Sequence, residues 1–558
     1  RPHHDFYFTL FNFMDNLAWQ KGSHNFRFGA QFQRVYVTPF HSNGLIPTYE
    51  IGLSAENPIF LDFSQFPGGI SSTDLGRAEG LLATLGGIVG GASQSFNIQD
   101  RSSGFVPGQE FRRRYSLHNY SFYAQDSWKL HRKVTVNLGL RWEYAGRFDE
   151  RDGLILSPIF TSVGVRDTLL SNATLDFAGH RVNRPLYSKD LNNFGPNIGL
   201  AWDLFGDGKT ALRAGYAINY VNDEVLLAAD NATGNNDGLV AQLALTDLVT
   251  TMSGTLPSFR APRFEVPRTT SQNFELNPVS ALFAADPLLR TPYVQQWTLG
   301  LQREIRKDTV LEVRYAANHG TSLLRGFDYN QVIIRQNGFL DDFIRARNNG
   351  FLALNRTGAF NPAFNPNIPG SQNLTVFPQL FQGGFLTNGT VRSLLRSGEP
   401  GELAAIYYVN GLEGRVRFVP NTNTFVADLI TNYSHSSYNA LQMEFRRRAA
   451  SGLQFQANYS FSKVLTDSSG PLVRFDPFLD YGNPRIERSR ADFDLTHVFN
   501  ANFVWPLPIG KGHRIRYQPL DRVLGGWTLG SILGWQSGAP FSILSGRGTL
   551  NRAARSRQ

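Results

Sequence analysis

The stretch NFGPNIGLAWDLFGDGKTALRAGYAINY, residues 193–220, decides how this chain folds. Its Gly-Lys-Thr at 208–210 could end a phosphate-binding loop, which needs a glycine five residues before the Gly-Lys pair and a helix after it. Position 203 is an aspartate instead, and its charge would repel a phosphate. The residues after Thr210 alternate with a period of two, which is the period of a strand. The segment therefore predicts two strands joined by a turn at Gly206–Gly208, without a nucleotide site.

Apolar side chains occupy every second position on both sides of that turn. They are Phe194, Pro196, Ile198, Leu200, Trp202 and Leu204 before it, and Leu212, Ala214, Tyr216, Ile218 and Tyr220 after it. Successive side chains of a strand point to opposite faces. Asp-Gly is a favoured hairpin turn because its backbone tolerates positive φ. The pattern thus predicts an antiparallel hairpin with one apolar face.

The same alternation recurs along the chain and predicts about twelve strands in all. The further hairpins are 6–19 with 24–37, 115–128 with 133–145, one within 293–320, one within 438–463, and 496–508 with 525–538. Within 293–320, the apolar set Trp297, Leu299 and Leu301 is expected opposite Leu311, Val313 and Tyr315.

Strand length and loop length separate a membrane barrel from a soluble β-sandwich. The predicted strands run for about 10 to 14 residues, whereas soluble strands average about five or six. Short connections lie near 20–23, 129–132, 206–208, 306–308 and 449–452, and long ones near 38–113, 148–192, 224–289, 321–435 and 467–492. Short periplasmic turns that alternate with long extracellular loops are typical of outer-membrane barrels. The fold class is therefore all-β, an antiparallel transmembrane β-barrel.

Charged side chains lie in phase on the face opposite the apolar one, because a charge facing lipid is costly. The candidates expected to face the lumen are Arg141, Glu143, Arg213, Glu304, Glu312, Arg314, Glu444 and Arg446. Leu138, Leu140, Leu200, Leu311 and Phe455 are expected to face outward. Asp126 is an exception, since it is in phase with Phe122 and Trp128, and we place it at interfacial depth near a short turn.

Composition and motifs argue against several other classes of protein. The 558 residues include no cysteine, which excludes disulfides and thiolate metal sites. The net charge of +9 comes from arginines dispersed along the chain, so no nucleic acid partner is predicted. The one dense run, Arg112–Arg114, is interpreted as a strand end or a solvated patch. No run approaches the ~18 apolar residues of a membrane-spanning helix.

No motif predicts a catalytic, metal or cofactor site. There is no HExxH and no Gly-x-Ser-x-Gly; His3 and His4 are interpreted as exposed, and His497, near Asp492 and Asp494, as structural. Segment 222–238 is rich in oxygen ligands but lacks the spacing of a calcium loop, so we interpret it as solvated. Segment 72–87 is expected to form a short helix in the first long loop.

Six segments resemble, in order, the barrel of Oar-like TonB-dependent receptors. They are 120–146, 193–220, 292–305, 438–463, 491–512 and 525–543, so the resemblance runs from about residue 6 to 544. It implies an outer-membrane barrel of roughly 22 strands that is closed by a plug. It also implies a Gram-negative outer membrane, contact with membrane lipid, a TonB complex as energy source, and a transported substrate that the sequence does not identify.

Against that family, the sequence predicts an incomplete barrel over 1–544 and an irregular tail over 545–558 that fits a shifted reading frame. The plug and the N-terminal sandwich domain of the family are expected to be absent from residues 1–558. The strands near 6–19 and 527–540 are expected to be separate sheet edges. The function implied is transport across the outer membrane without covalent chemistry, so the protein is not expected to be an enzyme. A passive porin or a surface-adhesion barrel is the alternative.

Overall fold

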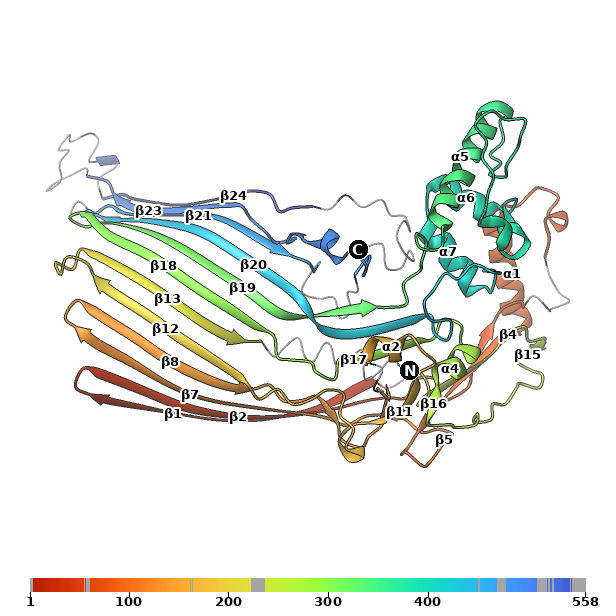
Figure 1. Cartoon of the computed structure of the whole chain (residues 1–558), viewed down its shortest axis with the longest axis horizontal. Helices are drawn as coiled ribbons and strands as arrows, with labels where there is room; N and C mark the ends of the chain where they lie inside the picture. The colour runs from red at the N-terminus through yellow and green to blue at the C-terminus, as the bar shows by residue number, and fades with distance from the viewer. Residues whose placement is uncertain are drawn as a thin grey trace.

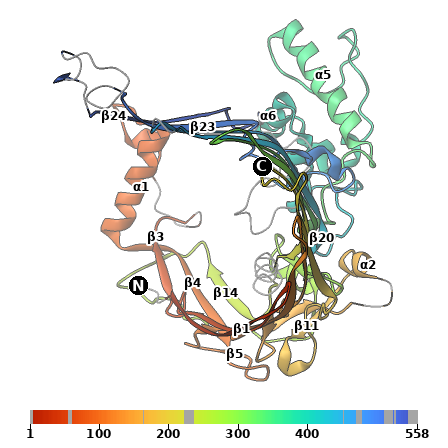
Figure 2. The ribbon, with the colours of Figure 1, turned by 90° about the vertical axis from the view of Figure 1, so that its left-hand side faces the viewer.

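The computed structural model describes residues 4–54, 56, 61–160, 162, 164–221, 236–449, 452–468, 478–508, 519, 522–523, 526–541 and 543. Twelve strands form a continuous sheet in the order β1-β2-β7-β8-β12-β13-β18-β19-β20-β21-β23-β24, and each pairs antiparallel with its neighbours. Figure 2 shows the sheet as an open curve with β1 and β24 at its two ends. These are the two edges that the sequence predicts.

The twelve strands confirm every hairpin that the sequence predicts. Their bounds are β1 (His4–Lys21), β2 (His24–His41), β7 (Tyr115–His131), β8 (Val134–Tyr144), β12 (Asn193–Asp203), β13 (Thr210–Tyr220), β18 (Tyr293–Arg306), β19 (Thr309–Asp328), β20 (Val426–Arg448), β21 (Gln454–Thr466), β23 (His497–Pro506) and β24 (Thr528–Gln536). In the β18–β19 hairpin, Leu299 is opposite Tyr315 and Leu301 is opposite Val313, as expected. Trp297 is instead opposite Ala317, and Leu311 is opposite Arg303.

Several strands are longer than the predicted 10 to 14 residues, and β20 reaches 23 residues. In β19 and β20 the extra length lies at the long-loop end. There β19 and β20 remain paired as far as Asp328 and Asp428, and β17 (Ala281–Ala285) adds to β20 in parallel. Because this part of the sheet is covered by loops rather than lipid, its side chains no longer alternate between polar and apolar, and the sequence pattern ends early.

The hairpin at 193–220 turns where predicted, and strand β13 begins at Thr210, where a phosphate-binding loop would require a helix. The carboxylate of Asp203 accepts hydrogen bonds from the backbone N–H groups of Gly206 and Gly208, both at 2.9 Å. Both glycines have positive φ, 76° and 72°, which glycine adopts without strain. The aspartate that rules out a phosphate site therefore holds the turn together.

The exception at Asp126 has a local explanation. Its carboxylate lies 2.6 Å from Nδ1 of His24, in the strand alongside and close to the short turns. The His24 ring stacks on Trp128 and on Phe26, with ring centroids 5.2 and 5.4 Å apart. The acid is thus hydrogen-bonded within an aromatic cluster at the end of the strands, which agrees with interfacial depth.

The long loops carry further regular structure (Figure 1). The helices are α1 (Ser72–Gly86), α2 (Val165–Leu169), α4 (Thr270–Leu276), α5 (Phe339–Thr357), α6 (Gly389–Ser397) and α7 (Pro400–Val409), with 3-10 turns η1 (Phe63–Gln65), η2 (His180–Val182), η3 (Phe377–Gln379), η4 (Phe381–Phe385) and η5 (Pro484–Glu487). The short strands are β3 (Thr48–Ile51), β4 (Ile88–Ile98), β5 (Phe105–Val106), β6 (Phe111–Arg112), β9 (Asp149–Glu150), β10 (Ile155–Pro158), β11 (Thr174–Ala178), β14 (Val240–Leu245), β15 (Thr250–Thr251), β16 (Arg268–Thr269) and β22 (Ser489–Arg490).

Helix α1 confirms the helix expected at 72–87. Ser71 caps its N-terminus by accepting the N–H of Asp74, and Gly87 ends it in the left-handed conformation. Within the described part of the chain, no helix is both long and apolar enough to cross a membrane.

We predict that Asp203→Ala will loosen the β12–β13 turn. Losing the carboxylate removes the acceptor of two hydrogen bonds, which costs about 1 kcal/mol and speeds hydrogen exchange at the Gly206 and Gly208 amides by about fivefold. Asp207→Ala is the matched control, because among the described residues Asp207 accepts a single hydrogen bond, from the N–H of Lys209 at 3.0 Å. Equal acceleration of the two glycine amides in both variants would contradict the role of Asp203.

Candidate functional site

The strand register places all eight candidate charged residues on one face of the twelve-stranded sheet, which we call the polar face. Arg141 is opposite Gly195, Arg213 is opposite Gly300, and Gly300 is opposite Arg314. Arg314 is in turn opposite Gln442, which is in phase with Glu444 and Arg446. Leu138, Leu140, Leu200, Leu311 and Phe455 share the other face, which we call the apolar face.

Hydrogen bonds join neighbouring strands across the polar face. Nε and Nη2 of Arg314 both donate to Oε1 of Gln442, at 2.9 and 2.6 Å. Arg213 donates to Gln302 at 3.0 Å. Arg141 forms an ion pair with Glu143 and donates to the Ser121 hydroxyl at 3.0 Å. The polar face therefore carries guanidinium, carboxylate and amide groups that are hydrogen-bonded to one another.

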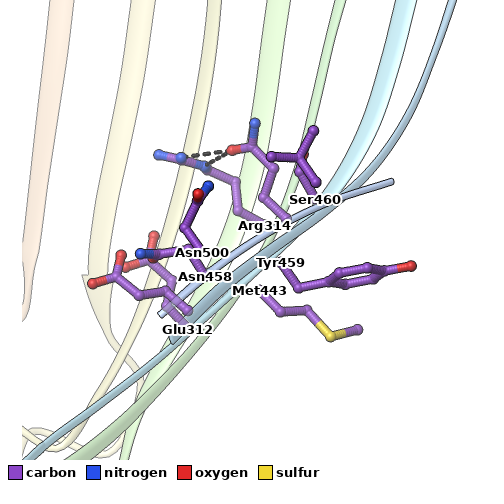
Figure 3. Close-up of a pocket in the computed structure, with 10 residues that line it drawn as sticks. Glu312, Arg314, Met443, Asn458, Tyr459, Ser460 and Asn500 are labelled. Carbon is purple, nitrogen blue, oxygen red and sulfur yellow. Dashed lines mark hydrogen bonds between the residues drawn. The ribbon is translucent and has the colours of Figure 1, made fainter. Parts of the chain in front are cut away.

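A pocket of about 240 Å³ opens on this face at strands β19 to β23 (Figure 3). Glu312 and Glu444 lie directly opposite each other in it, an arrangement that repels unless a cation or a donor is near. Arg446 lies 2.8 Å from Glu444, and Gln456 donates to the same carboxylate at 3.2 Å. Glu304 lies outside this group and accepts the N–H of Asp308 at 3.2 Å in the next turn.

The eight candidates are all charged, and the pocket also has uncharged residues. Asn458, Ser460 and Asn500 line it beside Glu312 and Arg314, and Figure 3 shows them on the side of the sheet opposite to Tyr459 and Met443. Their signal is in the sequence, since they share the two-residue phase of the charged residues. These amide and hydroxyl groups therefore belong to the same face as the eight charged candidates.

The long loops are joined to one another rather than independent. Strand β14 pairs with β4 of the first long loop, and β16 pairs with β11 of the second. Strand β17 pairs with β20. The Asn421 side chain donates to the backbone carbonyls of Leu169 and Ser171 at 3.0 and 2.8 Å. We call the described residues of 42–114, 145–192, 236–292 and 329–425 the loop body.

Between the first two loops lies a cavity of about 940 Å³ lined by Arg101, Arg112, Arg114 and Arg181 together with three acids. The hydrogen bond from Arg114 lowers the pKa of Asp152, so this acid is ionised and already paired. Burial raises the pKa of the neighbouring acid Glu150. Its carboxylate accepts the backbone N–H groups of Arg114, Asp152 and Leu154.

The structure confirms the interpretation of Arg112–Arg114 as a strand end, but it shows that this segment is not a fully solvated patch. Arg112 does end strand β6 and is exposed, but Arg113 is buried, with 3% of its surface exposed. Its guanidinium lies 4.4 Å from the Phe111 ring centroid. Burial became possible because the first two loops fold against each other, a contact that the local sequence does not encode.

The helical segment 329–425 has its own hydrophobic core, in which Phe339, Phe343, Phe377 and Leu395 are buried. Asp342 of α5 has no exposed surface and accepts the N–H groups of Thr375, Val376 and Phe377 at 2.8, 2.7 and 2.9 Å. One buried carboxylate therefore fixes η3 against α5.

The structure places the remaining candidates as follows. His497 lies 2.8 Å from the Tyr459 hydroxyl, which agrees with a structural histidine, and Asp494 is buried and accepts the N–H of Val464. No group of three or more histidine, aspartate or glutamate residues is placed to hold a metal among the described residues. His3 and most of 222–238 lie outside the described residues, as does the tail 545–558.

A sheet of twelve membrane-length strands with one apolar and one polar face defines the wall of a membrane β-barrel. The chain belongs to the outer membrane beta barrel domain family, whose sequence profile matches residues 3–558. It is therefore a protein of the outer membrane.

No curated protein matches the sequence, but solved structures do. The outer membrane transporter YddB from Escherichia coli is 11% identical, with 95% of this chain and 42% of that chain covered and a TM-score of 0.39. The alcaligin outer membrane receptor FauA from Bordetella pertussis is 9% identical, with 95% and 61% covered and a TM-score of 0.28. The copper transporter OprC is 7% identical, with 89% and 41% covered and a TM-score of 0.35. The chain spans less than two thirds of the length of each.

We predict that Asp342→Asn will loosen the helical segment. The asparagine amide places a donor against backbone donors, which costs about 2 kcal/mol and raises the rate of native-state tryptic cleavage within 329–425 by about thirtyfold. Asp341→Asn is the control, because Asp341 precedes Asp342 on the same helix and is exposed. Similar cleavage rates in the two variants would contradict this role of Asp342.

Proposed function

We propose that this chain forms part of the barrel wall of a TonB-dependent outer-membrane transporter of the Oar-like type. The observation that supports it best is the polar face, which runs across strands β8 to β21 and ends beneath the loop body. In this proposal the loop body captures the substrate outside the cell. The substrate then passes along the polar face, without covalent chemistry, as a plug driven by the TonB complex rearranges.

The polar face lines the lumen and the apolar face meets lipid. Leu138, Leu140 and Leu299 expose 46%, 51% and 53% of their surface on the apolar face, which supports a lipid contact there. Arg213 and Arg314 are on the polar face, and an arginine at the bilayer midplane would cost about 2 to 4 kcal/mol. The short turns face the periplasm and the long loops face outward.

Closure of the barrel requires more than these twelve strands. Among the described residues, strand β1 pairs only with β2 and β24 only with β23, so each leaves one edge of backbone groups without a described neighbouring strand. Unsatisfied backbone groups cost several kcal/mol each in lipid. We propose that further strands, about ten by the family resemblance, join these two edges. In this proposal residues 1–544 form an incomplete barrel, and the plug lies outside residues 1–558.

We predict that water reaches one face of the sheet only. The chain contains no cysteine, so in a single-cysteine variant a thiol reagent modifies only the introduced side chain. A charged, water-soluble thiol reagent should modify Ser460→Cys on the polar face at least about tenfold faster than Leu299→Cys on the apolar face. Equal rates would refute the assignment of the faces.

The same variant separates energised transport from a passive pore. In cells without the TonB complex, a plug that cannot move should slow the modification of Ser460→Cys by an externally added reagent. An unchanged rate would favour the passive porin.

We predict that residues 1–558 alone do not form a heat-modifiable barrel in detergent micelles, because both edges remain bare. A closed barrel resists SDS until it is heated and then changes its gel mobility. The chain supplied with the further strands should show this change. A heat-dependent shift from residues 1–558 alone would mean that these twelve strands close by themselves.

A further inference from the structure

The short turns carry nearly all of the excess positive charge of the chain. The five described turn segments are 21–24, 129–133, 203–209, 303–309 and 446–453, apart from 450–451, and we call them the basic rim. They contain eleven basic and four acidic side chains, a net charge of +7 against +9 for all 558 residues. Five of the eight lysines lie in them: Lys21, Lys129, Lys133, Lys209 and Lys307. The connection between β23 and β24, largely outside the described residues, adds four basic residues and one acidic residue by sequence.

The basic rim lies at one end of the sheet, opposite the loop body, where Figure 1 shows the turns gathered on the left. Some of its cations border the apolar face directly. Lys21 Nζ lies 5.5 Å from the Trp19 ring centroid, and the Arg303 guanidinium lies 5.8 Å from that of Phe205. Aromatic rings beside cations with apolar stems are typical of a membrane interface.

The acids of the rim do not neutralise these cations. Asp203, Asp207 and Glu304 accept backbone N–H groups of their own turns. Of the eleven basic residues, only Arg446 lies within 4.0 Å of a carboxylate of a described residue, that of Glu444. The remaining ten are exposed to solvent. The rim therefore presents free positive charge next to an apolar surface.

We propose that the basic rim binds the phosphate groups of anionic phospholipids in the membrane leaflet at the short-turn end. This proposal rests on the barrel orientation given under Proposed function, which makes that leaflet the periplasmic one. Each basic side chain near an anionic surface contributes about a fivefold increase in affinity, and the effect is screened by salt. Phosphates along the rim would hold the short turns at a fixed depth.

The test uses the membrane-extracted full-length protein in nanodiscs made from equimolar phosphatidylglycerol and phosphatidylcholine. Native mass spectrometry then measures the ratio of the two lipids that remain bound. The rim variant is Lys129→Gln/Arg132→Gln/Lys133→Gln. The control removes three exposed cations at the long-loop end, Lys189→Gln/Arg290→Gln/Arg396→Gln.

We expect phosphatidylglycerol to be enriched in the parent and the control, and its enrichment to fall at least about tenfold in the rim variant. High salt should reduce the enrichment in the parent. Undiminished enrichment in the rim variant, or an equal loss in the control, would overturn the proposal. Suppose that a protein co-purifies with the parent but not with the rim variant, and that the lipid ratio is the same in both. That result would overturn the proposal in favour of a protein partner.

Two single-cysteine variants separate this proposal from the orientation on which it rests. On intact cells, a membrane-impermeant maleimide should label Ser253→Cys in the loop body and leave Ser23→Cys in the first short turn unlabelled. External labelling of Ser23→Cys would refute the orientation whatever the lipid result. Correct labelling together with no lipid preference would refute the rim proposal alone.

Discussion

The structure depends on the pairing of backbone N–H and C=O groups between neighbouring strands. In lipid no water can replace a missing partner, so every membrane-spanning residue needs a neighbour in the ladder. An unbroken antiparallel order from β1 to β24 meets this demand at every internal strand. The pairing also explains why polar and apolar residues alternate with a period of two. A strand that is paired along both edges has only two surfaces left, its two faces, and successive side chains point to opposite faces.

That period separates the chemistry of the two faces. Side chains that share a face on one strand share it on the next, so Arg213, Arg314 and Glu444 form a common surface although they lie far apart in the sequence. At the ends of the strands the constraint relaxes. There Asp126 lies on the apolar face with His24 as its partner, and β19 and β20 continue into a part of the sheet that loops cover.

The fold of the sheet could be predicted from the sequence because its information is local. Each hairpin pairs residues close in the chain, and each strand shows its two faces directly; helix α1 was predictable from a segment of 15 residues. The fold of the loop body could not be predicted. Strands β4 and β14 are more than 140 residues apart, and neither sequence indicates which strand it pairs with. Burial of Arg113 was missed for the same reason, because it depends on the second long loop folding against the first. The contacts of Asp203 are local, and its sequence position pointed only to the absence of a phosphate site. The charged residues of the polar face were predictable, and the amides beside them share the same two-residue phase.

The shared sheets of the loop body have a consequence for how the protein can diversify. Surface loops of receptors are usually free to change one at a time, because each begins and ends on the same scaffold. Here β4 of the first long loop pairs with β14 and β15 of the third. Strand β11 of the second long loop pairs with β16 of the third. An insertion or a recombination breakpoint that replaces one of these loops leaves a strand without its partner in another. The natural unit of exchange between related proteins is therefore the three loops together, and variation in these loops should be inherited as a block.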